Sequence, residues 1–152
     1  MPKFAKDLGR KAGLSPGTLV HTGDPGQEKP RITVFAYNAD RCEEKSVETA
    51  AEAFFQGDNP GVFWINIDGL HEVELIAEFG RHFNLHPLVL EDILHTEQRP
   101  KLENYETYLF IVLKMLCWDD TTREIKAEQV SLVLGKDYVI SFQEESDFDV
   151  FG

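Results

Sequence analysis

The sequence has few cysteines and no long apolar run, and both absences limit what the chain can be. Cys42 and Cys117 are too few for a disulfide scaffold and fall in strand-like segments, so we expect a reduced, cytoplasmic setting. The longest strongly apolar run covers residues 108–113, whereas a membrane-spanning helix needs about 20 apolar residues. The N-terminus has basic residues but no following apolar stretch, which is not typical of a secretory signal. We therefore expect a soluble chain.

Basic residues are also scarce. There are 15 Lys and Arg against 27 Asp and Glu, which gives a net charge of −12. A chain of this charge repels the phosphate backbone of nucleic acids, so we expect no nucleic-acid partner. Cations and basic protein surfaces are the partners that the charge favours.

The common signatures of catalytic and cofactor sites are missing as well. The sequence contains no glycine-rich phosphate loop, no serine nucleophile elbow and no Cys-x-x-Cys pair. His82 and His86 have the spacing of a helical zinc pair, but Pro87 disfavours helical backbone at His86, so the pair does not share one helix. We therefore predict no enzymatic activity.

The chain nevertheless has enough apolar residues for one folded domain, since 42% of its 152 residues are hydrophobic and 11% are aromatic. Residues 1–30 hold five Gly and four Pro, which is typical of an extended, partly disordered arm. Residues 144–152 are acidic and lack a stop signal, and we interpret them as the start of a helical or linker segment. The sequence thus predicts an α/β domain over residues 31–143.

Hydrophobic periodicity predicts both helices and strands in that domain. The expected helices cover residues 48–56, 72–83 and 87–96, and the expected strands cover residues 31–37, 41–47, 62–67, 105–118, 124–134 and 137–143. The apolar phase changes near Gln129, which suggests a bulge or a late strand start. The order of the elements indicates a mixed α+β fold whose sheet has six or seven parallel and antiparallel strands.

Candidate binding residues gather in residues 86–101. Glu91 and Asp92 are adjacent on the predicted helix, and their side chains diverge by about 100°, so they cannot chelate one ion tightly together. His95 lies within hydrogen-bonding reach of both. The plain interpretation is a solvated acidic face, with Arg99 and Lys101 as its counter-charges.

Several motifs give this stretch a second interpretation. The run His-Pro-Leu-Val-Leu-Glu-Asp-Ile-Leu at residues 86–94, Gln-Arg-Pro-Lys at 98–101 and the aromatic segment at 103–115 closely resemble the N-terminal cytoplasmic domain of CorA-type magnesium transport proteins. Supporting pieces lie at residues 14–23, 64–69 and 128–134, so the resemblance covers nearly the whole chain.

The resemblance implies a sheet sandwiched between helices, a homopentamer in the full-length protein and a place on the cytoplasmic side of the membrane. The family's Gly-Met-Asn pore signature is missing, so the chain is expected to be a fragment that senses Mg²⁺, and possibly Co²⁺, without conducting it. The membrane would be reached only through C-terminal helices that this sequence lacks. The resemblance also implies that Asp92 binds a divalent cation between neighbouring subunits and that Glu91 belongs to a second site nearby.

Two functions remain open at this point. The first is a cation-sensing regulatory domain of a magnesium channel. The second is a stand-alone metal-dependent or small-molecule-binding α/β domain that uses Glu91, Asp92 and His95 at the edge of a pocket.

Overall fold

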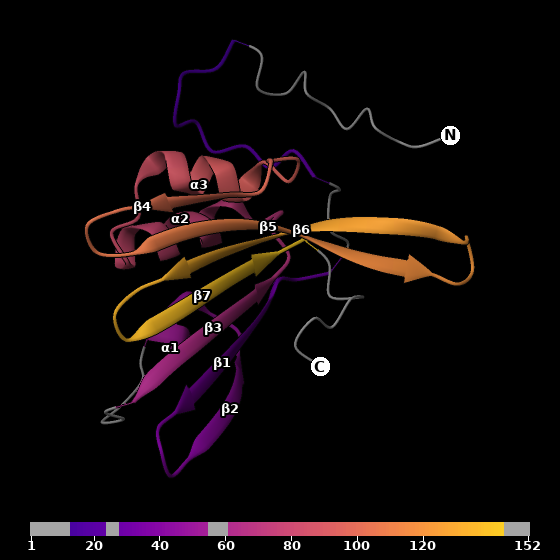
Figure 1. Cartoon of the computed structure of the whole chain (residues 1–152). Helices are drawn as coiled ribbons and strands as arrows, with labels where there is room; N and C mark the ends of the chain where they lie inside the picture. Colours follow the sequence, from indigo (N-terminus) through magenta and orange to yellow (C-terminus); the bar gives the residue numbers. More distant parts are fainter. Residues whose placement is uncertain (1–12, 24–27, 55–60, 145–152) are drawn as a thin grey trace.

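The computed structural model describes residues 13–23, 28–54 and 61–144, and these form a mixed sheet with helices packed on it (Figure 1). The elements in chain order are β1 (Arg31–Tyr37), β2 (Cys42–Val47), α1 (Ala50–Phe54), β3 (Val62–Asp68), α2 (Val73–His82), α3 (Pro87–Leu94), β4 (Lys101–Asn104), β5 (Leu109–Asp119), β6 (Glu124–Leu134) and β7 (Tyr138–Gln143). In these residues no helix is both long enough and apolar enough to cross a membrane.

The sheet has seven strands in the order β2-β1-β3-β7-β6-β5-β4. Strands β3 and β7 are parallel, and the other neighbouring strands are antiparallel. The prediction of a mixed sheet with six or seven strands is therefore confirmed.

One face of the sheet carries the core. Alternate residues such as Ile32, Ile65 and Ile140 point to this face, and they form one buried cluster with apolar residues from all three helices. A methyl group added to Gly80 of α2 would collide with Leu90 of α3, so the glycine lets these two helices pack closely. The second layer of helices that the resemblance implies has no counterpart in the described residues.

Strand β4 is an edge strand that the sequence analysis missed. A single strand was predicted over residues 105–118, but the chain pairs residues 101–104 with β5 and turns between them, where the Tyr105 N–H donates to the Tyr108 carbonyl over 2.9 Å. The side chains of β4 alternate only between half-buried and exposed, so its hydrophobic pattern is weak.

The outer half of the β5–β6 hairpin extends beyond the rest of the sheet (Figure 1). Strand β7 pairs with β6 only from Val130 to Leu134, whereas β5 and β6 stay paired out to Asp119 and Glu124. The pairing runs without interruption through Gln129, so the predicted bulge is wrong. The odd-numbered residues of β6 face the core along the whole strand, because Val133 pairs with Phe110 and Ser131 with Val112. The apolar phase changes because the core-facing positions 129 and 131 hold Gln and Ser, while the even-numbered apolar residues lie on the opposite face of the sheet.

Part of the N-terminal arm packs on α3. The Thr22 N–H donates to the Leu94 carbonyl over 3.1 Å, and residues 21–23 are buried. Residues 1–12, 24–27 and 145–152 lie outside the described residues, and with them much of the predicted arm and nearly all of the predicted C-terminal segment.

Candidate metal centre

Helix α3 positions the two predicted cation-binding residues, and its start is defined by the sequence around Pro87. Pro87 occupies the first turn, where a missing N–H costs nothing. His86 has extended backbone, and its Nδ1 accepts a hydrogen bond from the Leu88 N–H over 3.1 Å. His82 instead ends α2 and stacks on Phe54. His82 and His86 therefore do not share one helix, as predicted.

The apolar side of α3 fixes the direction of its acidic residues. Val89, Leu90, Ile93 and Leu94 are buried against the core, which turns Glu91 and Asp92 away from it. The helix ends at Leu94, two residues earlier than predicted, and His95 closes it with its N–H on the Glu91 carbonyl.

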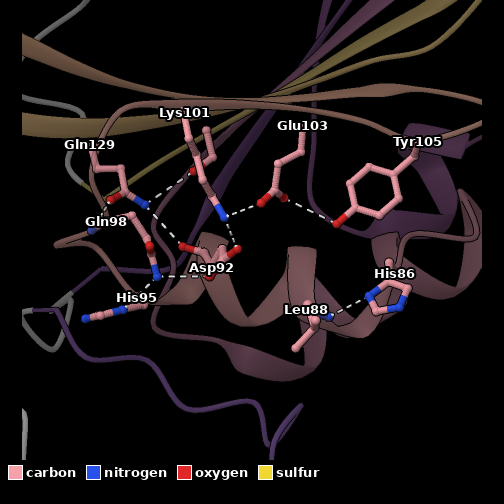
Figure 2. A network of polar contacts seen from close by, with 10 residues as sticks. His86, Leu88, Asp92, His95, Gln98, Lys101, Glu103, Tyr105 and Gln129 are labelled. Atoms are coloured by element: carbon pink, nitrogen blue, oxygen red, sulfur yellow. Dashed lines mark hydrogen bonds and ion pairs between the residues drawn. The ribbon is translucent and has the colours of Figure 1, made fainter.

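Asp92 is not the solvated residue that the plain interpretation assumes, because only 19% of its side chain is exposed. Its Oδ2 lies 2.6 Å from the Lys101 ammonium, and its Oδ1 accepts a hydrogen bond from Gln98 over 2.9 Å (Figure 2). The same Gln98 nitrogen lies 2.8 Å from Nδ1 of His95. Lys101, one of the two predicted counter-charges, therefore contacts Asp92, and Nδ1 of His95 lies within hydrogen-bonding distance of Gln98.

The network continues from Lys101 along β4 (Figure 2). The ammonium lies 2.9 Å from Oε1 of Glu103, and the Tyr105 hydroxyl donates to Oε2 of Glu103 over 3.3 Å. Burial lowers the pKa of Lys101, but its hydrogen bonds to Asp92 and Glu103 outweigh this and leave the pKa raised. Burial and the neighbouring Glu103 charge both raise the pKa of Tyr105, so the phenol stays a hydrogen-bond donor.

Gln129 ties the helix to the sheet, and the sequence analysis did not identify it as a site residue. It is 4% exposed on β6, and its amide nitrogen donates to the Asp92 carbonyl over 3.2 Å. Its amide oxygen accepts from the Gln98 N–H over 2.9 Å. The sequence feature that could have revealed this role is a polar residue, Gln129, at the point where the apolar pattern of residues 124–134 changes. A buried glutamine that reaches α3 explains that signal better than a bulge does.

Glu91 faces a different neighbour. Its Oε2 accepts a hydrogen bond of 2.8 Å from the Gly17 N–H of the N-terminal arm. Glu91 and Asp92 are thus in different surroundings, as their angular separation on the helix predicts. The resemblance implies two nearby sites, and this arrangement is compatible with two sites.

The chemistry of these groups suits a hard divalent cation. Mg²⁺ takes oxygen ligands, keeps several of its waters and is commonly bound through one or two carboxylates. The described residues contain no group of three or more His, Cys, Asp and Glu that could hold a metal. A water-rich site built on the Asp92 carboxylate fits this requirement, whereas a closed site of His and Cys ligands does not.

Comparisons with known proteins show what the chain is similar to. The family model described as CorA-like Mg²⁺ transporter protein matches residues 59–149. The chain is 44% identical, over 146 residues, to the cobalt/magnesium transport protein CorA of Thermotoga maritima, and the match covers 96% of this chain and 41% of that relative. The chain therefore spans about two fifths of that relative's length.

Solved structures show the same fold at low sequence identity. The soluble domain of CorA from Methanocaldococcus jannaschii superposes with a TM-score of 0.54 at 13% identity, over 76% of this chain and 41% of that one. The full-length CmaX protein superposes with a TM-score of 0.62 at 17% identity, over 84% of this chain and 38% of that one.

Proposed function

This chain belongs to the family of CorA-like Mg²⁺ transporter proteins, and from that premise we propose that it is the cation-sensing regulatory domain of a magnesium channel or transporter. The proposed sensing domain covers residues 31–143, behind an N-terminal arm of residues 1–30. It would lie on the cytoplasmic side of the membrane and contact neighbouring subunits of a homopentamer. Transport itself would belong to the complete protein.

The name of one relative supports the choice of cation. The Thermotoga maritima protein is named for cobalt and magnesium transport, so we propose Mg²⁺ as the regulatory ion and Co²⁺ as a second candidate. The net charge of −12 supports the attraction of divalent cations from solution. Because the family is one of transporters, we favour this role over a metal-dependent enzyme or a stand-alone binding domain.

We propose Asp92 as the main ligand and Glu91 as part of a second site. The observation that carries this proposal is that the Asp92 carboxylate already lies against a positive charge, on a helix whose other side is locked into the core. A carboxylate held in this way loses little conformational entropy when a hydrated cation binds. Further carboxylates would come from a neighbouring subunit.

The proposed mechanism is electrostatic. Carboxylates from adjacent subunits repel each other, and a divalent cation between them replaces repulsion by attraction. If the closed state brings these groups nearer than the open state does, Mg²⁺ binds the closed state more tightly and shifts the population toward it. A fall in internal Mg²⁺ would then release the closed state.

Calorimetric titration of this chain with Mg²⁺ tests the assignment of Asp92. We expect weak binding in the millimolar range that weakens further with added NaCl, because part of each site would be missing and salt screens exposed charges within about 10 Å at 0.1 M. Asp92→Asn should weaken it several-fold, because the carboxylate charge is lost while the side-chain shape is kept. Glu78→Gln, on the exposed side of α2, is the matched control that removes an equal charge.

The same substitution has a structural cost that can be measured separately. Asp92 bonds to Lys101 and Gln98, so Asp92→Asn should lower the free energy of unfolding by about 1 kcal/mol. In the complete membrane protein, the variant should need more internal Mg²⁺ to close. A folded Asp92→Asn chain with unchanged Mg²⁺ affinity would remove Asp92 from the sensor, and micromolar affinity of the unaltered chain would point to a complete site elsewhere.

A further inference from the structure

The Lys101 ammonium occupies the position between two carboxylates where a bound cation would be expected. It lies 2.6 Å from Oδ2 of Asp92 on α3 and 2.9 Å from Oε1 of Glu103 on β4 (Figure 2). Asp92 and Glu103 come from different elements, so Lys101 is the charge that lets the two carboxylates approach each other. Without a positive charge between them, they would repel.

The remaining oxygens of this pair also have donors. Gln98 donates to Oδ1 of Asp92, and Tyr105 donates to Oε2 of Glu103. All four carboxylate oxygens are therefore engaged within the chain. A cation that approaches Oδ2 of Asp92 is repelled by the ammonium 2.6 Å from that oxygen, and this repulsion favours displacement of the ammonium.

Lys101 is well fitted to its position. Its side chain is 28% exposed, and its Nζ lies 5.7 Å from the centre of the Phe110 ring, close enough for a cation–π contact. It is anchored on β4, whose pairing with β5 limits its movement. The ammonium therefore stays near Asp92 at a high effective concentration.

We infer that Lys101 competes with the regulatory cation for Asp92. Because Lys101 is tethered to β4, its ammonium neutralises Asp92 until a divalent ion displaces the ammonium toward Glu103. This inference rests on the proposed function, since it assumes that the cation binds at Asp92. To the proposed cation site it adds Lys101 as a residue that determines specificity, and it explains why the divalent cation would bind weakly and reversibly.

The competitor also discriminates by charge. Na⁺ or K⁺ brings the same single charge as the ammonium but lacks its tether, so neither ion gains by replacing it. A divalent ion brings one more positive charge to the two carboxylates and can compensate for the displaced ammonium. Lys101 would thus keep the site closed to the abundant monovalent ions.

The test is a calorimetric titration of the Lys101→Met variant of this chain with Mg²⁺. Removing the ammonium should tighten Mg²⁺ binding by at least about tenfold, because a divalent ion would no longer have to displace a positive charge at this distance. K⁺ should compete measurably with Mg²⁺ in the variant and not in the unaltered chain. In the unaltered chain, the NMR signals of the Lys101 ammonium and the Gln98 amide should shift together as Mg²⁺ is added.

Two controls separate competition from a general change in charge. Lys126→Met removes another lysine that pairs with an aspartate, Asp119 at 2.8 Å, and should leave Mg²⁺ affinity within about twofold. Lys101→Arg keeps the charge and should give no comparable gain. If Lys101→Met does not fold, Lys101→Gln is also neutral, can still donate to Asp92, and carries the same expectation.

The outcomes distinguish this inference from the proposed function. If neutral Lys101 variants bind Mg²⁺ no more tightly than the unaltered chain, while Asp92→Asn still weakens binding, Lys101 is no competitor and the site assignment stands. If adding Asp92→Asn to Lys101→Met leaves the tightened binding intact, the cation binds elsewhere and both proposals are overturned. Loss of the tightened binding in that double variant supports both.

Discussion

Phe110 and Trp118 lie on the same strand and point to the same face, yet they have opposite surroundings. Phe110 is 0% exposed because helix residues and the neighbouring strands cover it, whereas Trp118 is 59% exposed on the projecting part of the hairpin. Residue type and strand periodicity do not distinguish the two positions. The cost of truncating each side chain depends on the contacts that it loses.

We therefore predict different effects for alanine at these two residues. Phe110→Ala should lower the free energy of unfolding by about 3–5 kcal/mol, because it leaves a cavity in the core. Trp118→Ala should lower it by less than about 1 kcal/mol, because the indole is mostly in water. Chemical denaturation of both variants measures the difference, and equal losses would show that the outer hairpin is packed in solution.

At the scale of elements, the β5–β6 turn has its own electrostatic support. Asp119 Oδ1 accepts hydrogen bonds from the N–H groups of Thr121 and Thr122 at 2.8 and 3.2 Å, and Oδ2 lies 2.8 Å from the Lys126 ammonium. Arg123 adopts the left-handed conformation with φ 55°. These contacts hold a turn that receives no support from the core.

The hydrogen bond from Lys126, followed by those from Thr122 and Thr121, lowers the pKa of Asp119 from 3.8 to about 2. A lowered pKa means that the folded turn binds the proton less readily than the unfolded chain does. The stabilisation of the folded turn by ionised Asp119 is therefore complete above pH 3.8 and is lost as the pH falls through about 2.

An NMR titration measures this effect. The amide signals of Thr121 and Thr122 should change with a midpoint near pH 2, and the change should disappear in Asp119→Asn. Asp120→Asn serves as the control, because Asp120 accepts only the Trp118 indole N–H in the described contacts. A midpoint near the ordinary aspartate value would contradict the proposed contacts.

At the scale of the whole molecule, net charge and exposed apolar surface have opposite effects on self-association. The net charge of −12 opposes self-association. The sheet face without helices in the described residues exposes three leucines, Leu102 by 63%, Leu113 by 44% and Leu134 by 41%. Exposed apolar residues gathered on one face favour contact with another surface.

We predict that this chain is mostly monomeric or weakly associated at low salt. Added NaCl should increase association, because it screens charge repulsion and leaves the apolar attraction in place. Sedimentation velocity at low and high salt measures this balance. A tight pentamer at low salt would show that the described domain alone drives assembly.

Much of the fold could be predicted from local pattern. Strands β1 and β6 begin and end at the predicted residues, because alternating apolar residues and turn residues act over a few positions. Helix α3 begins at Pro87 as predicted, because proline has a local steric preference. The acidic pair Glu91 and Asp92 was also identified by sequence, with Lys101 as a counter-charge.

Other features required the tertiary structure. The edge strand β4 has little hydrophobic pattern and exists through its pairing with β5. The role of Gln129 depends on contacts between β6 and residues more than thirty positions earlier on α3. The position of Lys101 between Asp92 and Glu103 likewise joins a strand to a helix.

The sequence by itself determined most of the elements, the acidic character and the family motifs, since these depend on neighbouring residues and on composition. Only the tertiary structure decided which charges meet, because ion pairs depend on distances of a few ångströms between segments that the fold brings together. This is why the sequence motifs were enough to propose Asp92 as a ligand, while its 2.6 Å contact with Lys101 became visible only when β4 was placed beside α3.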